Sequence, residues 1–234
     1  MAPNSPPSPR AAATAAAITR LVRPLLPPPV VGYVGDLVAR QPVELRLSRP
    51  RRTKLGDHRP PTRATSVHRI TINEDLNPYA FLTTLLHEIA HAATWERHRG
   101  RRRVKPHGRE WKEQFAGILA PVVTAGLLPA GVTAALSRYL ENPAAASCSD
   151  RGLVLALAEF DAPTVGKVRV EDLDERMVFK AANGAVFRAG RMIRSRRACF
   201  ELSTGREYRV HGLAFVEPVA EPAPAKPRRR RRAT

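Results

Sequence analysis

Two histidines and a glutamate near the middle of the chain have the spacing best suited to chemistry. The segment His87-Glu88-Ile89-Ala90-His91 places two imidazoles four residues apart. On a helix such residues lie on one face, so both rings can reach the same ion. Glu88 lies beside them, close enough to polarise a water molecule without having to bind the ion itself. The pattern predicts a hydrolytic metal site, with zinc as the expected ion.

A catalytic zinc site needs a third protein ligand and an open position. The candidates that follow the motif are His98, His107, Glu110 and Glu113. We favour His107, because the positive end of a predicted helix directly after it disfavours a protonated imidazole. Gly108 has no side chain that would crowd the ion, and the loop over 95–106 gives the chain room to return. The predicted zinc ligands are therefore His87, His91 and His107.

The two motif histidines require a helix, and its ends are visible in the sequence. Asn77-Pro78 is typical of a helix start, with Asn as the cap and Pro in the first turn. The helix should end at about His98, before Gly100. Apolar residues at helical spacing should form its buried stripe: Phe81, Leu82, Leu85, Leu86, Ile89 and Ala93.

Other helices should follow this one in the same part of the chain. A helix is expected over 109–119, closed by Pro121, with Trp111 on its buried side. Two more are expected near 129–141 and 150–160. The site would therefore lie among helices.

Strands are expected on both sides of this helical part. Segments 43–47 and 67–73 alternate apolar and polar residues and predict two strands joined by a basic loop over 49–63. After about residue 165 the pattern changes to short strands separated by turns such as Asn183-Gly184. The expected strands of this small antiparallel unit are 177–180, 185–188, 192–202 and 207–215.

Composition limits the class of protein. The chain has 234 residues, of which 43% are hydrophobic, and this content excludes a wholly disordered chain. Its two cysteines, Cys148 and Cys199, exclude a disulfide scaffold and are compatible with a reducing compartment. No stretch approaches the ~20 apolar residues of a membrane helix. We expect a cytoplasmic protein without membrane contact, which could associate with the nucleoid.

The net charge of +18 indicates a polyanionic partner. Residues 1–30 carry three net positive charges and 217–234 carry four, which leaves eleven on 31–216. Both ends are proline-rich and are expected to be flexible. Basic runs on either side of the motif helix are the candidate nucleic-acid contacts, namely Arg51, Arg52, Lys54, Arg101, Arg102, Arg103 and Lys105.

Aromatic residues alternate with basic ones in the small strand unit. Phe187, Phe200 and Tyr208 are expected to be core residues of a small sheet. The alternative is that they stack on unpaired bases.

The motifs together resemble the SprT-like metalloproteins, which are related to the DNA-dependent protease Spartan. The resemblance is carried by the first motif and by His107-Gly108-x-x-Trp111, with Lys54-Leu55-Gly56-Asp57 and Ile70-Thr71-Ile72-Asn73 upstream. It covers about residues 40–120. It implies zinc on the three histidines, Glu88 as general base and later proton donor, and proteins bound or crosslinked to DNA as substrates. Many members carry a cysteine-rich zinc ribbon, which two cysteines cannot form.

The sequence therefore predicts an α+β chain. Its expected parts are a flexible segment 1–30, a zincin-like metallopeptidase domain 31–160 built from a short β-hairpin or sheet and helices, an antiparallel β domain 165–216, and a basic tail 217–234. The expected function is that of a zinc metalloendopeptidase in DNA–protein crosslink repair, with Zn²⁺ as cofactor and proteins and DNA as partners. Two alternatives are a nucleic-acid-binding module with a structural, silent zinc, and a general zinc hydrolase unrelated to DNA.

Overall fold

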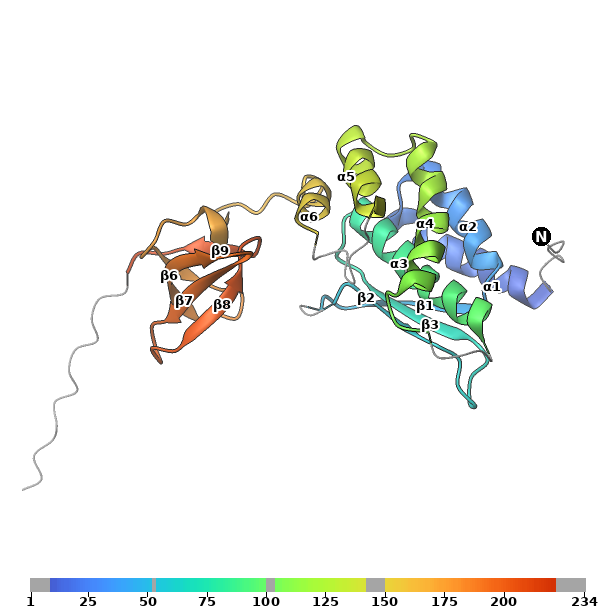
Figure 1. Cartoon of the computed structure of the whole chain (residues 1–234), viewed down its shortest axis with the longest axis horizontal. Coiled ribbons are helices and arrows are strands. Elements are labelled where there is room, and N and C mark those ends of the chain that lie inside the picture. Colours follow the sequence, from blue (N-terminus) through green and yellow to red (C-terminus); the bar gives the residue numbers. More distant parts are fainter. Residues whose placement is uncertain (1–8, 52–53, 100–103, 142–149, 222–234) are drawn as a thin grey trace, which may run out of the picture. The chain divides into compact units, whose positions relative to one another are not determined.

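The computed structural model describes residues 9–51, 54–99, 104–141 and 150–221. The chain divides into two compact units, Met1–Ala162 and Pro163–Thr234 (Figure 1). All α-helices of the described residues belong to the first unit, and each unit has its own sheet. The expected α+β class is confirmed. None of the described helices is long and apolar enough to cross a membrane.

In its described residues, the first unit combines one long α-helix with a small sheet and five other α-helices. In chain order, with η for a 3-10 helix, its elements are α1 (Pro9–Val22), η1 (Arg23–Leu25), η2 (Pro28–Val30), α2 (Val31–Ala39), β1 (Val43–Ser48), β2 (Gly56–Arg59), β3 (His68–Asn73), α3 (Pro78–His98), α4 (Arg109–Thr124), α5 (Ala130–Glu141) and α6 (Arg151–Ala158).

The sheet has the strand order β1-β3-β2, which differs from the expected pair of strands. β1 runs parallel to β3, with Val43 opposite His68, so a simple hairpin is excluded. The segment expected to be a basic loop contains β2, which pairs antiparallel with β3. Ile70 and Ile72 of β3 are fully buried. From the strand order, β2 lies at one edge of the sheet. Both β2 and β3 contact α3.

Helix α3 has the limits that the sequence predicts. The side-chain oxygen of Asn77 accepts hydrogen bonds from the backbone N–H groups of Tyr79 and Ala80, and Pro78 occupies the first turn. The expected apolar stripe is buried, except that Ala93 is half-buried: Phe81, Leu82, Leu85, Leu86 and Ile89.

The expectation of a flexible N-terminus is wrong for residues 9–30. They form α1 and two 3-10 turns, and Ala15, Ile18 and Val22 belong to the core of the first unit. These side chains are three and four residues apart, so they lie on one face of α1. The alanine-rich run has a high helix propensity, and the cluster Pro27–Pro29 comes only after α1 ends.

The other helices of the first unit follow the sequence expectation with one difference. Helices near 129–141 and 150–160 are confirmed as α5 and α6. Pro121 does not close α4, which continues to Thr124 with this proline inside it. Leu119 and Val122, on either side of Pro121, are buried. Their packing stabilises the helix across the proline.

The second unit is a small antiparallel sheet with its own core. Its elements are β4 (Val168–Arg169), η4 (Val170–Asp172), β5 (Val178–Lys180), β6 (Val186–Ile193), β7 (Arg196–Glu201), β8 (Glu207–His211) and β9 (Phe215–Pro218), and its strand order is β4-β9-β5-β6-β7-β8. The segment 192–202, expected to be one strand, is divided by a turn in which Arg194 has a φ of 55°. This left-handed turn lacks the glycine that usually marks one. Cys199 is a buried free thiol, whereas Cys148 lies outside the described residues.

Candidate metal centre

Three histidine side chains from two segments of the first unit converge on one point. The Nε2 atom of His91 lies 3.3 Å from that of His87 and 3.0 Å from that of His107. The third distance, between His107 and His87, is 3.2 Å. These ligand atoms form the one group among the described residues that is close enough to hold a metal ion.

The spacing of the three nitrogens fits a zinc ion. With Zn–N distances of about 2.0–2.1 Å and tetrahedral angles, neighbouring ligand nitrogens lie about 3.3 Å apart. The observed separations of 3.0–3.3 Å are close to this value. Three mutual hydrogen bonds cannot explain them, because each Nε2 atom of a neutral imidazole can either donate or accept, but not both. The donor set therefore fits a metal ion with three protein ligands.

Helix α3 and a tight turn bring the ligands together. His87 and His91 are one helical turn apart, as their spacing predicts. His107 has a left-handed backbone with a φ of 56°, which is uncommon for a side chain of this size. The backbone N–H of Gly108 donates to the carbonyl of Lys105 at 2.9 Å, and a Cβ at position 108 would lie 2.9 Å from that oxygen. Gly108 is therefore required by the geometry of this turn, and not, as the sequence suggested, to leave space beside the ion.

Trp111 of α4 forms the floor of the site. Its ring centroid lies 4.6 Å from that of His87, 5.3 Å from that of His91 and 4.8 Å from that of His107. Trp111 is 1% exposed and stacks on the ring of Phe115. These two aromatic side chains exclude water from behind the ligands.

Glu88 is buried between α3 and the edge strand β2. A Cβ at position 56 would lie 2.5 Å from its Oε1 and 2.7 Å from Cγ2 of Thr84. Gly56 is therefore needed for the close approach of β2 to the glutamate. Burial, assisted by the charge of Asp57, raises the pKa of Glu88 to about 8. A carboxyl group with a pKa near neutrality is suited to general acid–base catalysis.

The ligand histidines are held neutral, the form that binds metal. Burial and, to a smaller extent, the neighbouring His107 lower the pKa of His87 to about 4. Burial and the surrounding histidines lower the pKa of His91 to about 3. Burial also lowers the pKa of His107. Proton competition with a metal ion is therefore weak at neutral pH.

A comparison with protein families identifies this part of the chain. Residues 33–127 match the model of the SprT-like family. Over this range the chain is similar to SprT-like proteins. The resemblance stated from the motifs is thereby confirmed, and the match contains every residue of the metal centre. No curated protein and no solved structure matched the chain.

The first unit places two further histidines near the metal centre that the sequence did not reveal. His58 of β2 stacks on the ring of His91, with centroids 5.8 Å apart and ring planes inclined by 7°. Its Nε2 lies 2.8 Å from Nδ1 of the fully buried His68, whose Nε2 lies 3.1 Å from Oε1 of Glu96. The sheet register brings these residues together, so their spacing in the sequence gives no sign of the contact.

The other ligand candidates lie outside the cluster. Glu113 forms an exposed ion pair with Arg109, at 2.8 Å. His98 lies at the last residue of α3. Neither His98 nor Glu110 belongs to the group of atoms that could hold a metal ion.

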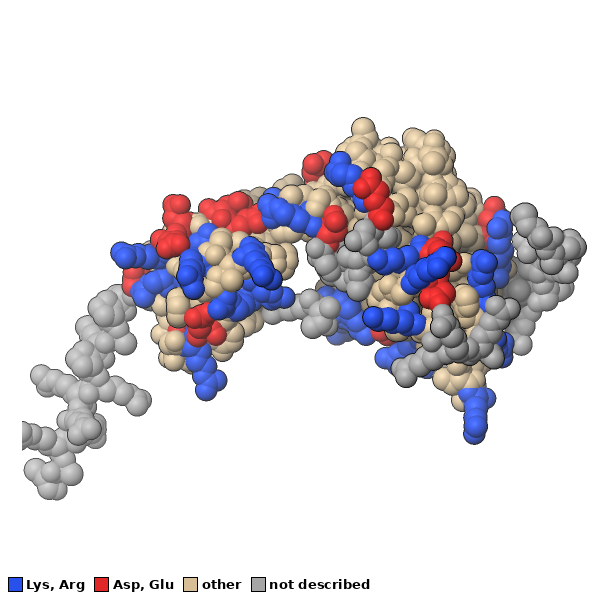
Figure 2. All heavy atoms as spheres, in the orientation of Figure 1, with Lys and Arg blue, Asp and Glu red and all other residues tan. Residues whose placement is uncertain are grey.

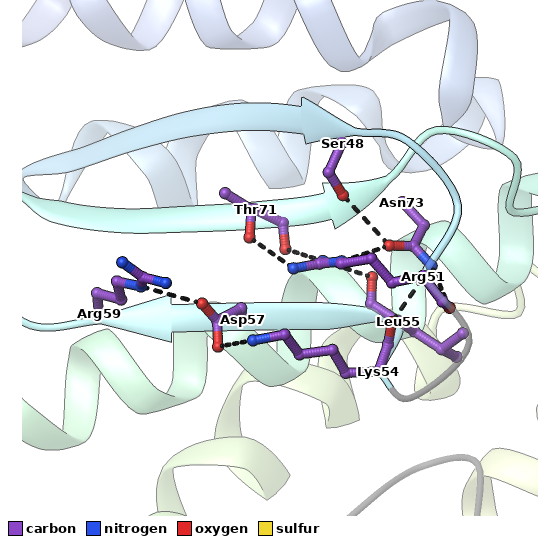
Figure 3. A network of polar contacts seen from close by, with 8 residues as sticks. All are labelled: Ser48, Arg51, Lys54, Leu55, Asp57, Arg59, Thr71 and Asn73. Atoms are coloured by element: carbon purple, nitrogen blue, oxygen red, sulfur yellow. Dashed lines mark hydrogen bonds and ion pairs between the residues drawn. The ribbon is translucent and has the colours of Figure 1, made fainter.

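The basic residues that were expected to contact nucleic acid differ in their exposure and in their partners within the protein. The guanidinium of Arg51 donates to the side chains of Asn73 (2.8 Å) and Thr71 (3.2 Å) and to the backbone carbonyls of Leu55 and Thr71 (Figure 3). It thereby attaches the β1–β2 connection to β3. Lys54 pairs with Asp57 at 2.6 Å. Lys105 is exposed. Outside the described residues lie Arg52, Arg101, Arg102 and Arg103.

Proposed function

We propose that the chain is a zinc-dependent metalloendopeptidase that hydrolyses peptide bonds in proteins associated with DNA. The observation that carries this proposal is a site with three histidine ligands and a buried glutamate beside them. Structural zinc sites are closed by four protein ligands, whereas catalytic sites keep one position open. The described residues supply three ligands, which favours catalysis over a silent structural ion.

The chain's own groups have distinct roles in this reaction. His87, His91 and His107 would hold the zinc ion, which when bound supplies Lewis acidity for the scissile carbonyl and for the attacking water. Glu88 accepts the proton of that water on its carboxylate and then donates it to the nitrogen of the leaving amine. Its raised pKa supports both transfers. Trp111 excludes other water from the ligands.

An extended peptide is the substrate that the surrounding structure favours. β2 is an edge strand, so one side of it has no strand partner among the described residues. A peptide can add to such an edge through backbone hydrogen bonds. Gly56 of β2 lies against Glu88, and His58 lies against His91. A peptide paired with this strand would therefore run past the reacting groups.

The second unit supports the DNA part of the proposal. In the sheet register, Arg188 is opposite Phe200, and Phe200 is opposite Glu207, so these side chains share one face. Phe200 is 42% exposed. Arg209 lies on the same face in the next row, and its ion pair with Glu207 is exposed. Exposed ion pairs contribute little, so a phosphate can replace the carboxylate.

This face combines the two elements of single-strand binding, namely an aromatic surface and positive charge. The ring of Phe200 lies close to Gly190, where a Cβ would be 3.3 Å from its Cε2. Figure 2 shows Lys and Arg over much of the visible face of the second unit, with Asp and Glu mainly at one edge. We therefore expect this unit to bind nucleic acid. A cytoplasmic location belongs to the same proposal.

Proteolysis by a matched pair of variants tests the function. The zinc-loaded full chain is incubated with a histone, with and without a single-stranded oligonucleotide. We expect cleavage that the oligonucleotide accelerates, and a loss of at least about a hundredfold in Glu88→Gln at equal zinc content. Glu113→Gln, which changes an exposed glutamate of α4, should cleave normally. Undiminished cleavage by Glu88→Gln would refute the assigned mechanism, and a wild type that binds zinc but never cleaves would favour the silent-zinc alternative.

A further inference from the structure

Among the described residues, no carboxylate or carbonyl is seen that would orient the rings of the three ligand histidines. Metal-binding histidines commonly donate their second N–H to a carboxylate or carbonyl. Within the described part of the chain, no such partner is seen for Nδ1 of His87, His91 or His107, and that of His87 is fully buried. The orientation of these rings therefore depends on the side chains that pack against them.

Packing differs among the three rings. His87 is in contact with Trp111 and Phe115, at centroid distances of 4.6 and 5.9 Å. His91 is farther from Trp111, at 5.3 Å. Among the described residues, His58 is the other aromatic ring that contacts it besides the two ligand histidines. The ring of His58 is nearly parallel to that of His91. His91 thus contacts α4 through Trp111 and β2 through His58.

A hydrogen-bond chain fixes His58 in this position. Glu96 accepts from Nε2–H of His68, so the neutral His68 ring has a lone pair on Nδ1. His58 must then donate its Nε2–H to that lone pair, across 2.8 Å. His68 is fully buried, and the edge of its ring contacts Trp95. The chain joins β2, β3 and α3, and it ends against a metal ligand.

We propose that His58, oriented by His68 and Glu96, is a positioning residue of the metal centre, whose ring restricts His91 to the orientation that reaches the ion. Removing the His58 ring would allow the His91 side chain to rotate. Zinc binding would then have to order that side chain again. Loss of a residue that orients a metal ligand typically weakens metal affinity by 10–100-fold. A phenylalanine at position 58 retains a flat ring but loses the hydrogen bond to His68.

Zinc affinity of the full chain, measured by competition with a chromophoric chelator, tests this inference. We expect about tenfold weaker binding in His58→Ala, a smaller loss in His58→Phe, which keeps a ring but not the hydrogen bond that orients it, and no change in the control His98→Ala. The Co²⁺ absorption bands should broaden and shift in His58→Ala, and less in His58→Phe. Equal affinity of wild type and His58→Ala, or equal losses in both His58 variants, would overturn the proposal.

One measurement on the wild type requires no variant. Long-range ¹H–¹⁵N spectra should show both His58 and His68 protonated at Nε2, and protonation of His58 at Nδ1 would also overturn the proposal. The inference rests on the metal site of the proposed function. A wild type that binds no zinc would refute that site, whereas normal zinc binding by His58→Ala refutes only the role of His58.

Discussion

Replacing Glu88 by glutamine should stabilise the metal-free protein while it removes catalysis. The carboxyl group has a pKa of about 8 in the folded chain, compared with an ordinary value of 4.5, chiefly because it is buried. A raised carboxyl pKa means that folding favours the neutral form. Stability is therefore lost as the pH rises from about 4.5 towards 8. Glutamine has nearly the same shape and is neutral at every pH.

The size of the effect follows from the two pKa values. A pH of 7 lies about 2.5 units above the ordinary pKa of 4.5, which corresponds to about 3 kcal/mol of stability at 1.36 kcal/mol per unit. At pH 5 the same reasoning gives less than about 1 kcal/mol. For a domain of this size, 1 kcal/mol shifts Tm by about 2–4 °C, so we expect an increase of about 6–12 °C at pH 7.

Urea unfolding followed by tryptophan fluorescence measures this gain, with a chelator present. The two tryptophans of the chain, Trp95 and Trp111, both lie in the first unit, so the signal reports on that unit. Glu113→Gln is the control, since its exposed ion pair should contribute less than about 1 kcal/mol. The reasoning is refuted if Glu88→Gln is no more stable than wild type at pH 7, or if its gain is equal at pH 5 and pH 7.

Three further predictions concern the wall of the site, its protons and the second unit. Gly56→Ala should lower the free energy of unfolding, measured with urea, by about 1–3 kcal/mol, because the added Cβ would lie 2.5 Å from Glu88. The control Gly117→Ala, at a position of α4 with open space around it, should be neutral or stabilising. In Glu88→Gln, zinc affinity measured by chelator competition should fall less than about tenfold between pH 7.5 and 5.5. Two ordinary imidazoles would cause a loss of roughly a hundredfold over this range, and the lowered pKa values of His87 and His91 remove that loss. Phe200→Ala should weaken binding of a labelled oligothymidylate at least about fivefold in an anisotropy assay, whereas Phe215→Ala, which removes a similarly exposed ring, should not; equal effects would contradict the proposed face.

Local signals were sufficient for the main helix of the site. Asn77 and Pro78 determine where α3 begins, and the spacing of its apolar residues determines which side is buried. The two histidines of the motif therefore had to share a face. The choice of His107 as third ligand depended on its place before a helix, and the structure brings all three nitrogens together.

Features that depend on contacts distant in sequence were missed. The segment Gly56–Arg59 is polar and has no β-branched residue, and it becomes a strand because β3 and the contacts of Arg51 hold it. The partnership of His58, His68 and Glu96 likewise exists only through the sheet register. Helix α1 was missed because the prolines near it dominated the composition, although the buried side of α1 has ordinary helical spacing.

Metal analysis of the purified full chain beside His107→Ala tests the central claim most directly. This substitution removes one of three nitrogens that lie within 3.3 Å of one another and leaves α3 unchanged. We predict about one zinc per chain in the wild type and loss of stoichiometric zinc in the variant, with both proteins folded by circular dichroism. Equal zinc content in the two proteins would contradict the three-histidine site and would point to Glu110 or Glu113 as the third ligand.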